Sequence, residues 1–470
     1  MFVGRKNELQ KLNELEKSTQ FEFLTLYGRR RVGKTALLDE FVKGKKVIYY
    51  LAQQANDKTN LDDFSSVIYR YFGLPDSTPA FSRWDHALSF IYEQSTQMTE
   101  KIILIIDEYS YAAESNKSLG SMLQHTIDHQ FKQSNIFLIL CSSYISFVEK
   151  NVIGYNAPLY GRRSATMKLR PFDYKTTGEL LGNISNVDKI SYYATLGGIP
   201  FYLNLIRPED SFESNIQRLF FELDGTLYAE PAILINEELR EPANYNSILQ
   251  AIATGNETSA QISQKTGIPA TSLPRYLNTL IGMDFIEKLV PFGENLEKSK
   301  KGKYQMKDNL LRFWYRFVFF NRNMIERGLG SRLAEKKILS KENMSTFIGK
   351  PVFEEICLDY LNLQALDDKL DLFPTTFGTW WGTDSASRLP TDVDVVVSDE
   401  FDHKIILGEC KWRNDFNAKE EFSKLTEKSR LFPNYQASYF FFMKQEPTVT
   451  VQELADEMQI TLVTLNNLFD

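Results

Sequence analysis

A glycine-rich segment near the start of the chain has the residue types and spacing of a phosphate-binding loop. It fits the pattern GxxxxGK[ST] and consists of Gly28, Arg29, Arg30, Arg31, Val32, Gly33, Lys34 and Thr35. In such a loop, backbone N–H groups surround the phosphates, the lysine reaches the β- and γ-phosphates, and the final hydroxyl binds Mg²⁺. An apolar run at residues 21–27 precedes the loop, and a helical pattern begins at Lys34. Because a phosphate loop requires this context, we predict ATP and Mg²⁺ as ligands.

A pair of acids follows a second apolar run, at residues 102–106. Asp107 is expected to hold Mg²⁺ through water, and Glu108 to polarise the water that attacks the γ-phosphate. A third apolar run, at residues 136–141, is followed by Ser142 and Ser143. Small polar side chains at this position either sense the γ-phosphate or simply end a strand, and the sequence leaves both interpretations open.

The elements that must position these residues indicate an α/β domain over residues 1–205. Its short apolar runs show no alternation and are separated by helical patterns. This arrangement predicts a parallel sheet with helices on both faces. Residues 206–240 are predicted to form a helical connector or lid.

Near residue 241 the sequence changes to short helical patterns separated by turn residues. This pattern predicts a winged helix-turn-helix over residues 241–325. A short helix at 258–266 ends at Gly267, and a second helix spans 270–280. Two short strands around residues 295–302 would form the wing. Five lysines and no acid lie between residues 298 and 307, enough for several phosphate contacts. Winged helices also serve as lids between domains, so DNA contact and an internal lid are both open.

Two strand-like runs in the last predicted domain, residues 340–470, carry acids in an unusual pattern. The period of two puts Asp392 and Asp394 on one face of their run and aligns Glu409 with Lys411 on theirs. Charges on an otherwise apolar strand are costly unless they are paired or bound to a metal. An acid followed by E-x-K is the signature of the restriction-endonuclease-like fold. There Asp394 and Glu409 would hold Mg²⁺, and Lys411 would position a water near a scissile phosphate.

A third acid of such a site is expected on a helix that begins near residue 351. Glu354 shares a helical stripe with Leu358 and Leu361 and should face inward. Glu355 shares its stripe with Asp359 and should face water, so Glu354 is the candidate. A fold kept for partner binding, with its charges satisfied as ion pairs, is the alternative to an active nuclease.

Several short segments along the chain occur together in one protein family. They are Phe2-Val3-Gly4-Arg5, the loop GRRRVGKT, the strand LIIDEY, Tyr160-Gly161-Arg162-Arg163, Gly197-Gly198-Ile199-Pro200-Phe201 and Glu409-Cys410-Lys411-Trp412. With these segments the chain resembles the archaeal-type P-loop ATPases of the AAA-related STAND class. The resemblance implies that Gly4 and Arg5 lie near the nucleotide and that Arg162 approaches the γ-phosphate, with a structural ion pair as the alternative for Arg162. It also implies a winged helix and a C-terminal PD-(D/E)XK nuclease-like domain.

Composition limits the remaining possibilities. The 470 residues carry a net charge of −7, so the whole chain is not a nucleic-acid-binding polycation and any such surface must be local. Three cysteines cannot build a disulfide framework, and no apolar run is long enough to span a membrane. With no signal-peptide pattern at the start, we expect a cytoplasmic protein. His125 and His129 lie one helical turn apart without a third ligand and predict an ordinary helix face.

Our leading hypothesis is a Mg²⁺-dependent ATPase whose nucleotide state controls a winged helix and a nuclease-like effector. The effector would act on nucleic acid, with DNA favoured over RNA. The alternative is a nucleotide-switched regulator that binds DNA or protein and cuts nothing. A homo-oligomer or a protein partner is left open.

Overall fold

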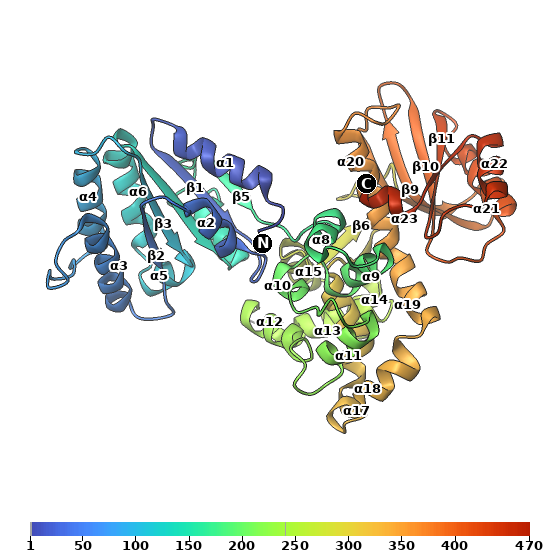
Figure 1. Cartoon of the computed structure of the whole chain (residues 1–470), viewed down its shortest axis with the longest axis horizontal. Coiled ribbons are helices and arrows are strands. Elements are labelled where there is room, and N and C mark those ends of the chain that lie inside the picture. The colour runs from blue at the N-terminus through green and yellow to red at the C-terminus, as the bar shows by residue number, and fades with distance from the viewer. Residues whose placement is uncertain (1, 240) are drawn as a thin grey trace. The chain divides into compact units, whose positions relative to one another are not determined.

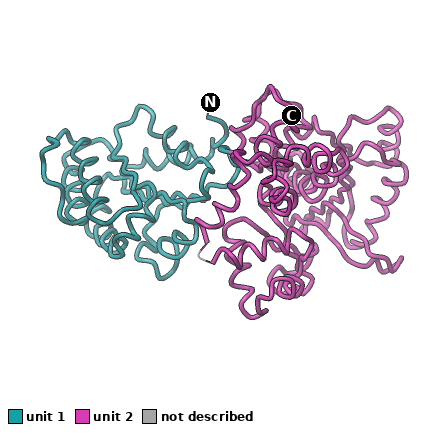
Figure 2. Tube along the Cα trace, turned by 90° about the horizontal axis from the view of Figure 1, so that it is seen from below, with its two compact units in different colours: residues 1–171, 199–201 teal, residues 172–198, 202–470 magenta. Residues whose placement is uncertain are grey.

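In the computed structural model, which describes residues 2–239 and 241–470, the chain divides into two units. Unit 1 comprises residues 1–171 and 199–201, and unit 2 comprises residues 172–198 and 202–470 (Figure 2). Residues 172–198, which the sequence analysis assigned to the N-terminal domain, therefore lie in unit 2.

The apolar runs of unit 1 form a five-stranded parallel sheet in the order β2-β3-β4-β1-β5. Every residue of β3 and β4 is buried, which is why neither strand alternates in sequence. One face packs against α3, α4 and α6, while Phe41 of α2 contacts Phe137 on the other face. The predicted parallel sheet between helices is confirmed (Figure 1). The strands are β1 (Glu22–Tyr27), β2 (Val47–Leu51), β3 (Ile102–Asp107), β4 (Ile136–Ser142) and β5 (Ala165–Lys168). The helices are α1 (Lys6–Lys17), α2 (Lys34–Val42), α3 (Asp57–Phe72), α4 (Trp84–Ser95), α5 (Tyr109–Ser115), α6 (Leu119–His129) and α7 (Ile145–Val148).

Unit 2 begins with helices that lead into a helix-turn-helix and a two-stranded wing. Helix α14 starts at a capping box of Thr258 and Gln261 and ends at Gly267, whose φ of 72° favours glycine. The predicted helix-turn-helix is therefore present. Its elements are α13 (Pro242–Ala253), α14 (Ser259–Thr266), α15 (Leu273–Gly282) and the antiparallel strands β6 (Ile286–Leu289) and β7 (Lys303–Met306). The preceding helices are α8 (Tyr174–Leu181), α9 (Asn186–Leu196), α10 (Pro200–Leu203), α11 (Phe212–Phe220) and α12 (Glu230–Glu238).

The C-terminal part of unit 2 is a second α/β layer built on a mixed sheet in the order β12-β11-β10-β9-β8. Strands β8, β9 and β10 form an antiparallel meander, and β11 and β12 continue in parallel with β10. The strands are β8 (Thr376–Thr383), β9 (Pro390–Asp399), β10 (Lys404–Lys411), β11 (Gln436–Met443) and β12 (Ile460–Val463). The helices are α16 (Asn309–Phe313), α17 (Arg322–Glu326), α18 (Gly330–Leu333), α19 (Lys341–Phe347), α20 (Glu354–Leu366), α21 (Ala418–Glu427), α22 (Val449–Glu457) and α23 (Leu465–Phe469).

The predicted α/β class is thus confirmed for both ends of the chain. Among the helices of the described residues, none has both the length and the apolar composition needed to cross a bilayer.

Candidate nucleotide site and C-terminal charge cluster

The glycine-rich loop joins β1 to α2 and has the close backbone contacts that require its glycines. A Cβ on Gly28 would lie 2.4 Å from the carbonyl oxygen of Leu169, and Gly33 has a φ of 95°. The Lys34 side chain is 5% exposed, and its ammonium donates to the carbonyls of Gly28 and Arg29 at 2.8 and 3.0 Å. Thr35 is exposed at the start of α2. The loop therefore has the curled form that places Lys34 and the helix N-terminus at one point.

Side chains within and beside the loop fix its shape. Arg29 and Val32 are buried, whereas Arg30 donates to the Tyr111 hydroxyl at 2.9 Å. The guanidinium of Arg31 lies 4.7 Å from the centre of the Phe201 ring. Arg5, which the family resemblance places near the nucleotide, donates to the backbone carbonyls of Val32 and Arg170 at 3.3 and 2.6 Å. The arginines thus hold the loop in shape through these contacts and also give it a positive charge.

The two acids lie at the carboxyl end of β3, two strands from β1 in the same parallel sheet. Asp107 accepts one hydrogen bond from the Tyr49 hydroxyl at 2.7 Å and one from the N–H of Glu108 at 2.9 Å. Burial and the Asp107 carboxylate raise the pKa of Tyr49, which therefore remains a donor. Glu108 has a left-handed φ of 50° at the turn between β3 and α5, where it is the N-cap residue of α5.

The serines after β4, the strand between β1 and β3, have different partners. The Ser143 hydroxyl and N–H donate to the two oxygens of Glu108 at 2.5 and 3.2 Å, whereas Ser142 is buried and donates to the Ser110 hydroxyl. The structure therefore assigns Ser143 to holding Glu108. The sequence analysis did not identify Tyr49, although a hydroxyl on an otherwise apolar strand was the available signal.

Arg162 forms an ion pair within unit 1. Its guanidinium donates to both oxygens of Asp128, at 2.7 to 3.1 Å, and to the carbonyls of Pro158 and Tyr160 at 3.0 Å. This arrangement favours the structural alternative for Arg162. On the same helix, the rings of His125 and His129 lie 4.5 Å apart.

In unit 2, three of the predicted acids face one lysine that the sequence analysis did not single out. The ammonium of Lys350 lies 3.1 Å from Asp392, 3.2 Å from Glu354 and 4.0 Å from Asp394. Burial raises the pKa of both Glu354 and Asp394, and their acidic neighbours raise it further. Asp394 also accepts the N–H of Cys410 at 2.9 Å, which places it beside Glu409.

Glu409 and Lys411 are close together, as predicted, but each has another partner. The Glu409 carboxylate forms ion pairs with the ammonium groups of Lys411, at 2.5 Å, and Lys428, at 2.6 Å. Lys411 forms a second ion pair with Glu421 at 2.9 Å. The Lys411 side chain is only 17% exposed. Although burial opposes it, the two lysines lower the pKa of Glu409. Within residues 2–239 and 241–470, no three His, Cys, Asp or Glu side chains are grouped closely enough to hold a metal ion.

One expectation about this region is wrong. Glu355 was expected to face water, but it lies between α20 and the winged helix, where it accepts a hydrogen bond from Gln305 of β7 at 3.1 Å. Burial raises the pKa of Glu355 to about 8. Glu355 is half-buried by this contact, whereas Asp359 and Asn362, further along the same stripe of α20, are exposed as expected.

The base of the wing contacts the C-terminal sheet. The N–H of Phe292 donates to the carbonyl of Thr379 on the edge strand β8 at 2.8 Å, and its ring lies 5.9 Å from that of Phe432. Lys298 and Lys300, nearer the tip, are exposed, whereas Lys301 pairs with Glu294 at 2.7 Å. The base of the wing therefore packs on the C-terminal sheet while Lys298 and Lys300 stay exposed, and this geometry is compatible with both a lid and a DNA contact.

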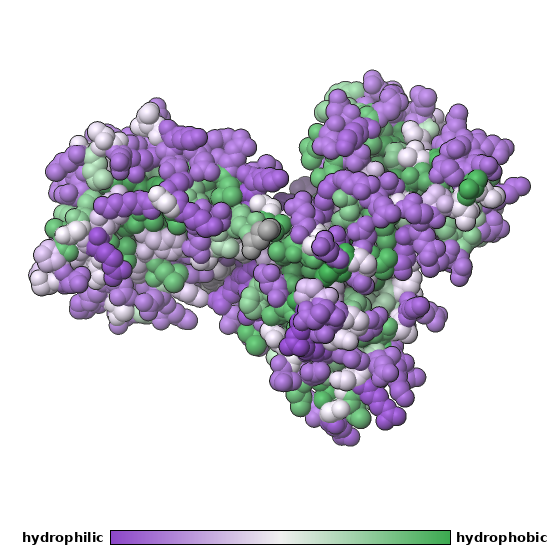
Figure 3. Space-filling view, viewed as in Figure 1, coloured by the Kyte–Doolittle hydropathy of each residue, from purple (hydrophilic) through white to green (hydrophobic). Residues whose placement is uncertain are grey.

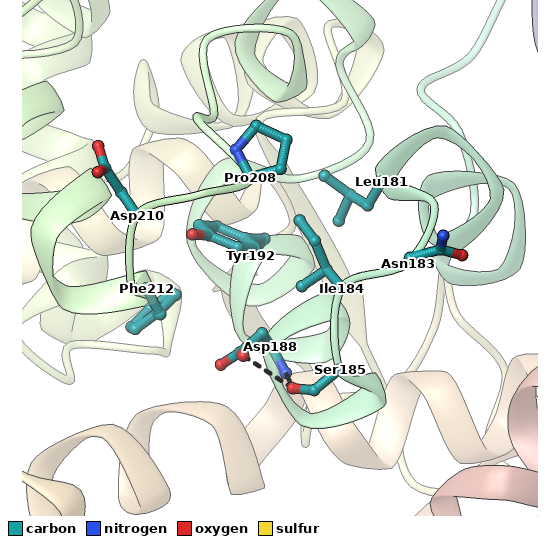
Figure 4. Close-up of a pocket in the computed structure, with 9 residues that line it drawn as sticks. All are labelled: Leu181, Asn183, Ile184, Ser185, Asp188, Tyr192, Pro208, Asp210 and Phe212. Carbon is teal, nitrogen blue, oxygen red and sulfur yellow. Dashed lines mark hydrogen bonds between the residues drawn. The ribbon is translucent and has the colours of Figure 1, made fainter.

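A cavity of about 400 Å³ lies in unit 2, away from every predicted site residue. Asp188, Asp210 and Tyr192 are among the residues that line it. The Ser185 hydroxyl donates to the Asp188 carboxylate and accepts the N–H of Asp188 at the start of α9 (Figure 4). None of its residues has the spacing of a phosphate or metal site.

Three segments of the chain match known protein families by sequence. Residues 2–206 match the family described as an ATPase domain predominantly from Archaea, and residues 246–289 match the IclR helix-turn-helix domain. Residues 314–425 match a family of archaeal and bacterial proteins of unknown function. The uncharacterised ATP-binding protein MJ0423 of Methanocaldococcus jannaschii is 47% identical over 47 residues, which cover 10% of this chain and 80% of that protein.

Among solved structures, the Walker-type ATPase paby2304 of Pyrococcus abyssi aligns with a TM-score of 0.52 and 21% identity, over 67% of this chain and 96% of that one. This likeness supports the α/β fold described above. The uncharacterised protein MJECL04 of M. jannaschii is 32% identical over 437 residues, which cover 92% of each chain. The chain therefore belongs to the same family as MJECL04 and carries an N-terminal ATPase domain of the type found predominantly in Archaea.

Proposed function

We propose that the protein is a Mg²⁺-dependent ATPase whose nucleotide state controls DNA binding by its helix-turn-helix. The observation that carries the proposal is the topology of unit 1. The glycine-rich loop, the acidic pair and Ser143 follow β1, β3 and β4, which are neighbours in one parallel sheet. Carboxyl ends of parallel strands meet at one edge, where such sheets bind their ligands.

Each residue has a distinct role in this proposal. Lys34 leaves its carbonyl partners to meet the β- and γ-phosphates. The oxygens of Thr35 and Asp107 are hard donors of the kind Mg²⁺ prefers, and these two residues would hold the ion. When bound, Mg²⁺ neutralises charge that develops on the phosphates. Glu108, held by Ser143, orients the attacking water and accepts its proton.

Two substitutions separate binding from hydrolysis. Lys34→Ala should abolish ATP binding because it removes the cation that faces the phosphates. Glu108→Gln should bind ATP normally and hydrolyse it at background rates. Lys58→Ala, on an exposed side chain of α3, is the matched control. Unchanged ATP affinity of Lys34→Ala in a calorimetric titration would exclude this site.

The DNA-binding part of the proposal is supported by the surface of α15. Thr271, Ser272, Arg275 and Asn278 are exposed, and residues 258–283 contain no acid in a chain of net charge −7. The N-terminal part of the second helix of such a module reads bases in the major groove. Arg275→Ala combined with Asn278→Ala should reduce discrimination between duplex sequences in a binding selection. Identical selected sequences for variant and parent would remove α15 from the interface.

For the C-terminal domain we favour a role without cleavage. Lys350, Lys411 and Lys428 neutralise the acids that would have to bind Mg²⁺, so the residues as arranged do not suit that ion. The domain would then act as a nucleotide-controlled regulatory or partner-binding module. Cleavage of duplex or single-stranded DNA by the purified protein with Mg²⁺ or Mn²⁺ and ATP, lost in Asp394→Ala, would contradict this.

Metal-dependent cleavage is the second candidate, favoured by one observation. Glu354, Asp394 and Glu409 come from α20, β9 and β10 and still lie around neighbouring lysines at one end of the sheet. If this candidate is right, Asp394→Ala and Glu409→Ala lose metal binding and cleavage. Lys411→Ala should lose cleavage but retain the metal, as isothermal titration with Mn²⁺ would measure.

A further inference from the structure

A strongly basic segment lies outside every site described above. Residues 316–341, here called the basic arm, contain seven lysines and arginines and two acids, within a chain of net charge −7. All seven cations are exposed. They are Arg316, Arg322, Arg327, Arg332, Lys336, Lys337 and Lys341.

The core of unit 2 holds the basic arm in a fixed orientation. Ile325, Ala334 and Ile338 are buried, and they lie on α17 and on the helical turns that follow Gly330. A Cβ on Gly330 would lie 2.0 Å from the carbonyl oxygen of Phe221, so α18 is pressed against the end of α11. Because the apolar side faces inward, the charged side chains must point outward. In Figures 1 and 3 the region of α17 and α18, at the lower end of unit 2, shows mainly hydrophilic residues.

The cations of the basic arm differ from the lysines of the wing in their ion-pair partners. Within the part of the chain that the structure describes, none of the seven lies within 4.0 Å of a carboxylate. The wing differs, since Lys301, Lys303 and Lys307 each have an acidic partner. Glu326, one of the two acids of the basic arm, is engaged by the Tyr228 hydroxyl at 3.1 Å. The basic arm is therefore a local positive surface on an acidic protein.

We propose that the basic arm is a nucleic-acid-binding surface, separate from the helix-turn-helix, that contacts the phosphate backbone without reading sequence. Fixed cations on one surface displace the counterions of a polyphosphate backbone, which supplies most non-specific affinity. Phe320, 54% exposed among these cations, provides a ring on which an unpaired base can stack. An anionic membrane fits less well, because a helix that binds a bilayer presents a broad apolar face. In the basic arm Ile325, Ala334 and Ile338 are buried, and the exposed large apolar side chains are Phe320, Met324 and Leu329.

The test compares two fourfold variants of the full chain that lose equal charge. The arm variant carries Arg327→Ala, Arg332→Ala, Lys336→Ala and Lys337→Ala. The control carries Lys58→Ala, Lys117→Ala, Lys369→Ala and Lys419→Ala, all at exposed positions outside the basic arm. Affinities for a duplex of about 30 base pairs and for a single strand of the same length are measured by fluorescence anisotropy over a KCl series. Circular dichroism and thermal melts verify that both variants fold.

If the four cations contact phosphates, the arm variant binds duplex about tenfold or more weakly, and its log–log salt slope falls by about 3 to 4 for duplex and 2 to 3 for single strand. The control keeps the parent's slope. An arm variant with the parent's slope on both nucleic acids overturns the proposal, as does binding of the parent to phosphatidylserine vesicles without binding to either nucleic acid. The proposal does not depend on the function of α15. If only the variant with Arg275→Ala and Asn278→Ala loses affinity, the basic arm is refuted and the proposed DNA binding by α15 stands.

Discussion

Glu355 provides a prediction that depends on the structure rather than on the sequence pattern. Its side chain is half-buried between α20 and β7, and Nε2 of Gln305 donates both to its carboxyl group, at 3.1 Å, and to Glu287, at 2.7 Å. Arg312 is 8% exposed and lowers the pKa of Glu355, but no ion pair joins them in the described part of the chain. Burial is the larger effect and raises the pKa of Glu355 to about 8. The replacement Glu355→Gln keeps the shape and the acceptor oxygen but cannot ionise.

The sign and size of the effect follow from linkage. A carboxyl group whose pKa is higher in the folded than in the unfolded state stabilises the fold while it is protonated. That stabilisation is complete below the unfolded pKa near 4.5 and is lost as pH rises toward 8. The loss is about 1.4 kcal/mol per pH unit in this window, which sets an upper bound of about 4 to 5 kcal/mol, and water entry would reduce it to about 2 kcal/mol. Glu355→Gln should therefore match the parent at pH 5 and exceed its stability at pH 9.

The assay is urea denaturation followed by tryptophan fluorescence, since four of the five tryptophans lie in unit 2. The free energy of unfolding is measured at pH 5, 7 and 9 for the parent and for Glu355→Gln. Because the other titrating groups are the same in both proteins, their contributions cancel in the difference between the two free energies. Glu453→Gln, at an exposed position of α22, is the control. A difference that stays constant across the three pH values, or a variant less stable at pH 9, would refute the assignment of a buried, protonated Glu355.

Three further predictions concern single contacts. Ser143→Ala removes the hydroxyl that holds Glu108 and should lower ATP turnover about tenfold with unchanged ATP affinity, as steady-state kinetics and titration would measure. Gly28→Ala places a methyl group 2.4 Å from the carbonyl oxygen of Leu169. It should destabilise unit 1 by about 2 kcal/mol or more and abolish ATP binding; a normal melting temperature would contradict this. Phe292→Ala removes an aromatic contact worth about 1 kcal/mol and should speed amide exchange in the wing, and unchanged protection would show that the wing does not depend on it.

Features set by neighbours in the chain were predictable from the sequence. Gly28, Gly33 and Lys34 act through a single turn between a strand and a helix, so their spacing alone determines how the loop curls. The buried strands were readable because both faces are covered, which leaves a continuous apolar run. The alternation rule likewise placed Glu409 and Lys411 on one side of β10, because strand geometry has a period of two.

Contacts between segments distant in sequence were decided only by the tertiary structure. The sequence analysis did not identify Lys350 and Lys428 as partners of the acids, because their position depends on how α20 and the turn after α21 pack on the sheet. Glu355 was misplaced for a related reason. A helical stripe shows which side is polar, and Asp359 and Asn362 on that side are exposed, but Gln305 of the wing lies against Glu355. Burial at this one position then changed the chemistry of the carboxyl group. Local periodicity determines the direction of a side chain, whereas packing determines what it meets.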